Sequence, residues 1–148
     1  MSYFSTEAMI SMANGVPKNI NLVKSGDYIL NRLSKVVRVK TISNVNFTSA
    51  NTVQFDNSTP LFYTLPTTKF LKHQIHEDNR HSSNYDTILN IYTENSKLKK
   101  NMKIFAYDSD VAITSYNDTP VTKILYTFST IDSVQSCFVN GVIVKMTL

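Results

Sequence analysis

The chain has 148 residues, of which 42% are hydrophobic and 18% are charged. This length and composition are those of one folded domain spanning residues 1–148, and they exclude a disordered tail. No apolar run approaches the ~20 residues of a membrane-spanning helix, and the N-terminus lacks the basic start and apolar block of a secretory signal. We therefore expect no membrane partner and no secretion.

The formal net charge of +4 comes from basic side chains scattered along the chain, with one cluster at Lys97, Lys99 and Lys100. Scattered charge indicates a solvated surface, whereas a nucleic-acid-binding face concentrates its Lys and Arg. The pattern disfavours nucleic acid as the partner, although a basic nucleic-acid-binding module stays an alternative. Cys137 is the only cysteine, so an internal disulfide is excluded, which suits a reducing compartment.

Short β-branched and aromatic runs, separated by Asn, Ser, Thr, Asp and Gly, predict an all-β domain. The predicted strands cover residues 9–12, 17–22, 28–30, 35–42, 53–55, 61–65, 69–71, 88–92, 102–107, 111–115, 123–128, 137–139 and 142–146. Turns are predicted at 13–15 and 25–27, and a polar surface loop at 72–86. The strongest hairpin signal is Asn140-Gly141, because both residues tolerate positive φ.

Three stretches carry a further pattern in chain order. The first joins Ala8–Gly15 to Val23–Leu30, which contains Gly26-Asp27; the others are Tyr63–Leu71 and Phe138–Val144. They resemble the splicing blocks of the hedgehog/intein (Hint) self-processing family, namely GD-x-[VI]-[LV], T-P-x-H-x-[FL] and F-x-x-N-G-[VIL]-x-V. The resemblance implies a horseshoe or barrel-like β domain whose N- and C-terminal strands run together through the centre.

Active members of this family use four chemical groups. A thiol or hydroxyl on the first residue attacks the preceding carbonyl, and a histidine protonates the departing amide nitrogen. At the end of the domain, an asparagine amide cyclises on its own carbonyl with help from the histidine before it. The resemblance places Tyr3, Thr68, Lys145 and Met146 at these positions. The phenol of Tyr3 lies too far out to close a five-membered ring, and the thioether of Met146 cannot cyclise. We therefore expect no catalytic residue, no cofactor and no metal site.

These replacements predict a non-enzymatic Hint-like module, a structural or protein-binding component with protein partners in a larger assembly. Lys greatly outnumbers Arg, Asn and Ile are abundant and Gly numbers 3, a bias typical of AT-rich coding DNA. One setting that fits, by analogy, is a minor capsid or virion protein of a large DNA virus. The expected location is then cytoplasmic or virion-associated.

Two other features leave alternatives open. Residual self-cleavage could use Ser5, if the register shifts by two residues, or Cys137, although the position of this cysteine before an apolar strand favours a core role. The histidines have an H-x-x-H-x4-H spacing that metal ligands can have, but no cysteine lies near them. A solvated polar loop is the simpler interpretation of His73, His76 and His81.

Overall fold

The computed structural model of the chain describes residues 2–55, 62–71, 92–98, 103–105, 110–132 and 134–146. Within these ranges the domain is all-β, as predicted, with two single-turn 3-10 helices, η1 (Ile20–Leu22) and η2 (Asn95–Lys97). No helix among the described residues is long and apolar enough to cross a lipid bilayer.

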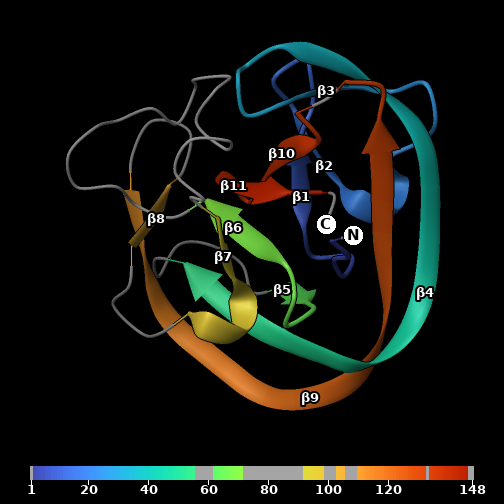
Figure 1. Cartoon of the computed structure of the whole chain (residues 1–148). Helices are drawn as coiled ribbons and strands as arrows, with labels where there is room; N and C mark the ends of the chain where they lie inside the picture. Colours follow the sequence, from blue (N-terminus) through green and yellow to red (C-terminus); the bar gives the residue numbers. More distant parts are fainter. Residues whose placement is uncertain are drawn as a thin grey trace.

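One antiparallel sheet brings the two ends of the chain together. Its six strands lie in the order β2 (Pro17–Asn19), β1 (Met9–Ser11), β10 (Ser136–Val139), β11 (Val142–Lys145), β6 (Lys69–Leu71) and β7 (Tyr92–Glu94). The N-terminal strand β1 therefore pairs directly with the C-terminal hairpin, with Ile10 opposite Val139. Figure 1 shows both chain ends close to each other near the centre of the molecule.

The second sheet curves around the first. Its strands lie in the order β3 (Tyr28–Leu30), β4 (Val36–Phe55), β9 (Asp110–Thr130) and β8 (Lys103–Phe105), and β5 (Phe62–Thr64) pairs with β4. The strands β4 and β9 are 20 and 21 residues long. They form the outer arc of the molecule in Figure 1.

Each long strand was predicted as two shorter strands, and this prediction was wrong. The stretch between the predicted strands 35–42 and 53–55 is rich in Asn, Ser and Thr, which usually indicate a turn. In the structure it stays paired with β9, and the irregular residues are absorbed as shifts in register. The predicted strands 111–115 and 123–128 are likewise parts of β9.

The predicted strand 17–22 also differs, because only its first half is extended. The amide of Ile20 donates to the carbonyl of Ala8, which continues the pairing of β2 with β1. The amide of Val23 then donates to the carbonyl of Ile20 and closes a 3-10 turn. Of the other predicted segments, residues 61, 72–91, 102 and 106–107 lie outside the described residues.

Side chains from both sheets share one apolar core. Its largest fully buried members include Phe4, Phe62, Phe70 and Phe128, and the rings of Phe4 and Phe62 meet edge to face with centroids 5.7 Å apart. The backbone of Phe4 exchanges two hydrogen bonds with Tyr126 of β9. The N-terminal segment is thus packed between the strands, where it approaches the C-terminal hairpin.

The hairpin between β10 and β11 has the predicted tight turn. Asn140 and Gly141 both have positive φ, at 49° and 83°, as a type I′ turn requires. The side-chain oxygen of Asn140 also accepts a hydrogen bond from the amide of Met9 at 2.7 Å. The turn therefore holds the N-terminal strand as well as joining two C-terminal strands.

Candidate functional site

The two chain ends meet at Ser2. Its amide donates to the carbonyl of Met146 at 3.0 Å, and its hydroxyl donates to the carbonyl of Lys145. The side chain of Ser2 is buried. This junction lies where the resemblance places the chemistry of active Hint domains.

Tyr3 follows with its ring directed into a small apolar cluster. The ring is half-buried and meets Phe47 edge to face, with centroids 4.9 Å apart. It also packs against the buried Leu65 and Leu125. The main-chain carbonyl of Tyr3, in contrast, accepts a hydrogen bond from the Thr64 hydroxyl at 2.8 Å. Tyr3 thus contributes its backbone to the junction and its side chain to the core.

The resemblance places Thr68 at the histidine position of the middle block, and its hydroxyl lies 2.7 Å from that of Thr64. Both side chains are fully buried. A hydroxyl carries one proton, and Thr64 donates its proton to the carbonyl of Tyr3. Thr68 must therefore be the donor in the pair, so its only proton is held by Thr64.

The last two predicted positions carry an ammonium group and a thioether. Lys145 is half-buried, and its ammonium group lies 5.4 Å from the ring centroid of Tyr92. Met146 is buried in the main core, and its amide donates to the carbonyl of Gln135 at 2.7 Å. The structure thus brings Lys145 and Met146 to Ser2, and Tyr3 and Thr68 to Thr64.

Ser2 was not predicted from the sequence, because placing Gly15 on the turn glycine of the family puts Tyr3 at the first position. The signal was present: Ser2 carries a hydroxyl on Cβ, the group that active members need there. The backbone contact that identifies it joins residues 144 positions apart in the sequence, Ser2 and Met146. No local pattern contains that contact.

The other candidate nucleophiles are engaged elsewhere. The buried Ser5 hydroxyl accepts a hydrogen bond from the amide of Tyr63 at 2.8 Å, which fixes β5 to the N-terminal segment.

The three histidines considered as metal ligands, His73, His76 and His81, lie outside the described residues. Within the ranges that the structure describes, no three His, Cys, Asp or Glu side chains gather in a way that could hold a metal ion.

Cys137 is buried in the main core, and this burial raises the pKa of its thiol. Because the thiolate is the reactive form, we expect the folded chain to react with a disulfide reagent such as dithionitrobenzoate at least ~100-fold more slowly than the urea-unfolded chain. Absorbance of the released thiolate gives both rates. Equal rates would show that Cys137 is accessible and would restore it as a candidate nucleophile.

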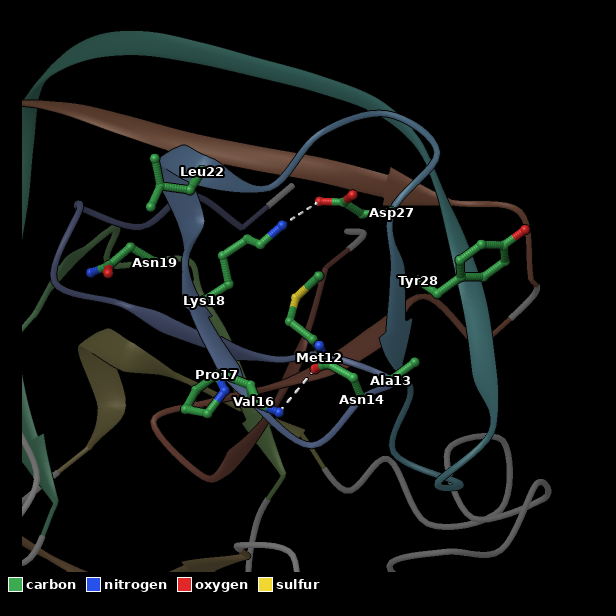
Figure 2. A pocket seen from close by; sticks show the side chains of 10 residues that line it. All are labelled: Met12, Ala13, Asn14, Val16, Pro17, Lys18, Asn19, Leu22, Asp27 and Tyr28. Atoms are coloured by element: carbon green, nitrogen blue, oxygen red, sulfur yellow. Dashed lines mark hydrogen bonds and ion pairs between the residues drawn. The ribbon is translucent and has the colours of Figure 1, made fainter.

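A second feature, which the sequence did not predict, is a groove beside β2 with a volume of about 460 Å³. Figure 2 shows the Lys18 side chain reaching toward Asp27, with Leu22 and Tyr28 to either side. Lys18 and Asp27 form an ion pair at 3.0 Å. A hydrogen bond from the amide of Lys24, aided by Lys18, lowers the pKa of Asp27. Exposed aromatic and apolar side chains bordered by polar groups are typical of protein-contacting surfaces.

The large exposed side chains at this groove are apolar or aromatic. Val16, Leu22 and Tyr28 are all more than half exposed. Asn14 shapes the turn that leads into the groove, because its side-chain oxygen accepts a hydrogen bond from the amide of Val16 at 3.0 Å. The groove is lined by β2, by the turn that precedes it and by the start of β3.

The chain is similar to several solved inteins over nearly its whole length. A DnaB intein from Synechocystis sp. PCC 6803 superimposes with a TM-score of 0.76, at 12% identity and 100% coverage of both chains. A bacterial intein-like domain from Clostridium thermocellum gives 0.74, at 18% identity and 98% and 99% coverage. The gp41-1 intein gives 0.72, at 10% identity and 98% coverage of both.

At the level of sequence, no protein-family model and no curated protein matches the chain. The structural likeness extends over the outer arc, the central hairpin and both ends, because the coverage is nearly complete. The predicted all-β, Hint-type architecture is confirmed, and the chain has the intein-like Hint fold.

Proposed function

We propose that this chain is a non-catalytic Hint-fold module that acts through its surfaces, as a structural or protein-binding component of a larger assembly. The observation that carries the proposal is the hydrogen-bonded pair Thr64 and Thr68, which binds the carbonyl of Tyr3, the residue after Ser2. By the resemblance, Thr68 is at the position where an active member needs a general acid.

The chemical reason is the protonation of the leaving group. Breaking an amide bond requires a proton on the departing nitrogen, and an efficient donor has a pKa near the working pH. An alcohol such as Thr68 gives up its proton only far above neutral pH, and here it donates that proton to Thr64. Met146 has no amide with which to cyclise. Both halves of a splicing reaction therefore lack a group.

The groove beside β2 supports a protein partner. Leu22 and Tyr28 present apolar surface next to the Lys18–Asp27 ion pair, a combination that a folded protein or an extended peptide can cover. The basic residues behind the net charge of +4 are scattered along the chain, which favours a protein partner over a nucleic-acid partner. The finer proposal, a minor capsid or virion protein of a large DNA virus, is an analogy, because the Lys- and Asn-rich composition is typical of AT-rich coding DNA and indicates a source.

One observation favours a second function, residual cleavage before Ser2. The Ser2 hydroxyl lies at the junction and could attack the carbonyl carbon of residue 1. That step would form an ester bond to Oγ, break the peptide bond and move the hydroxyl proton to the Ser2 nitrogen. Hydroxylamine would then cleave the ester.

The two functions are separated by a fusion that carries a folded tag before residue 1. We expect its intact mass to be unchanged after days at neutral pH with hydroxylamine, because Thr68 donates its only proton to Thr64 and is no general acid at neutral pH. The matched control is Ser2→Ala in the same fusion, which removes the hydroxyl. A tag released from the unmodified fusion but not from the control would overturn the non-catalytic proposal.

The binding role is tested by co-purification from the native source. Leu22→Asp with Tyr28→Ala should remove the associated protein, while Ile131→Asp, at an exposed apolar residue outside the groove, should retain it. Equal retention by both variants would show that the groove is not the contact surface.

A further inference from the structure

The middle of β4 forms an open sheet edge. On the side of β4 away from β9, β3 pairs with residues 36–38 and β5 pairs with residues 51–53. Between them, no strand in the described part of the chain pairs with residues 41–50 on that side. Figure 1 shows this stretch on the outer side of the arc, with β9 inside it.

Pairing elsewhere in the sheet shows which backbone groups point outward. Tyr126 of β9 exchanges both of its backbone hydrogen bonds with Phe4, so its N–H and C=O point away from β4. Its partner Asn44 therefore belongs to a non-hydrogen-bonded pair. Because such pairs alternate, Ile42, Asn44 and Asn46 direct their N–H and C=O groups to the open edge.

The side chains leave this edge unprotected. Ile42 and Val45 are 50% and 44% exposed, and Ile124, opposite Asn46 on β9, is 54% exposed. No charged residue and no proline occurs from Thr41 to Phe55, although 18% of the whole chain is charged. Edge strands that avoid pairing carry charges, proline or a cover, and the irregularities of β4 fall outside residues 42–47.

We infer that β4 of a second copy pairs antiparallel with this edge, about a twofold axis at Asn44. Ile42 then faces Asn46 of the second copy, Asn44 faces its own equivalent, and Asn46 faces Ile42. Each of these three pairs is of the hydrogen-bonded type, so every outward N–H and C=O of the three residues gains a partner. This inference is independent of the proposed function.

The edge is complementary to itself, which favours a second copy as the occupant, because in this register each outward N–H of residues 42, 44 and 46 meets a C=O of the same three residues. Each copy carries a net charge of +4, so two copies repel wherever lysines come face to face. In the register centred on Asn44, Lys40 faces Thr48 of the second copy, and no charged side chain faces another between Thr41 and Phe47. The uncharged edge is thus a place where two copies approach with little repulsion.

The experiment is sedimentation equilibrium over a roughly hundredfold range of concentration, since a dimer must dissociate on dilution. We expect the unmodified chain to reach twice its mass of 16.8 kDa at the high end. Asn44→Lys and Asn44→Asp should each weaken the dimer by at least about tenfold, because like charges then face each other across the axis. An equimolar mixture of the two should dimerise again.

A control variant distinguishes pairing at this edge from non-specific hydrophobic association. Ile131→Lys removes another exposed apolar side chain and should leave the dimer unchanged. A monomeric unmodified chain at all concentrations, or single variants that still dimerise, would overturn the inference. A mixture that stays monomeric while both variants are folded by circular dichroism would overturn the Asn44 register.

A measurement on the unmodified chain covers the case in which a variant unfolds. The amides of Ile42, Asn44 and Asn46 should be protected from hydrogen exchange in the concentrated sample and exchange at least about tenfold faster on dilution. Amides that exchange equally fast at both concentrations would contradict the pairing of this edge.

Discussion

Replacing Phe4 by alanine is expected to lower the free energy of unfolding by about 3–5 kcal/mol, the usual cost of removing a buried ring. Phe4 is fully buried in the main core and packs edge to face on Phe62. Its backbone links the N-terminal segment to Tyr126 of β9. The cavity left by the ring would lie between segments that are far apart in the sequence, so the structure can close over it only partly.

Urea unfolding measures this change, and it can be followed by circular dichroism or by tyrosine fluorescence, since the chain has no tryptophan. The control is Val36→Ala, which shortens a side chain that is more than half exposed and should change the stability by less than about 0.5 kcal/mol. A Phe4→Ala variant as stable as this control would mean that the N-terminal segment is not part of the core.

Gly141→Val is expected to destabilise the fold by about 1–3 kcal/mol, because a β-branched residue resists positive φ. Gly141 has φ of 83° in the turn between β10 and β11. An added Cβ would meet no other atom within 4 Å, so the penalty comes from the backbone and not from a collision. The turn also holds Met9 through Asn140, which extends the effect to β1.

The matched control is Gly141→Asn, since asparagine tolerates positive φ better than other side chains. We expect it to be the more stable of the two variants when their urea midpoints are compared. Equal destabilisation by valine and asparagine would show that the loss does not arise from the conformation at residue 141.

The local sequence was sufficient to predict those features of the fold that depend on a single short-range rule. The all-β class follows from repeated β-branched runs, and the turn at Asn140-Gly141 follows from two residues that accept positive φ. The turns at 13–15 and 25–27 are closed by hydrogen bonds from the amide of Gly15 to Met12 and from the amide of Asp27 to Lys24. Strand β6 begins and ends at the predicted residues.

Only the tertiary structure decided the length of the long strands, the first residue of the junction and the groove. The polar residues in the middle of β4 look like a turn in isolation, but pairing with β9 over most of its length keeps them extended. Ser2 meets Met146 because β1 pairs with the hairpin of β10 and β11. Such contacts depend on how distant segments are brought together, and a local pattern carries no information about that arrangement.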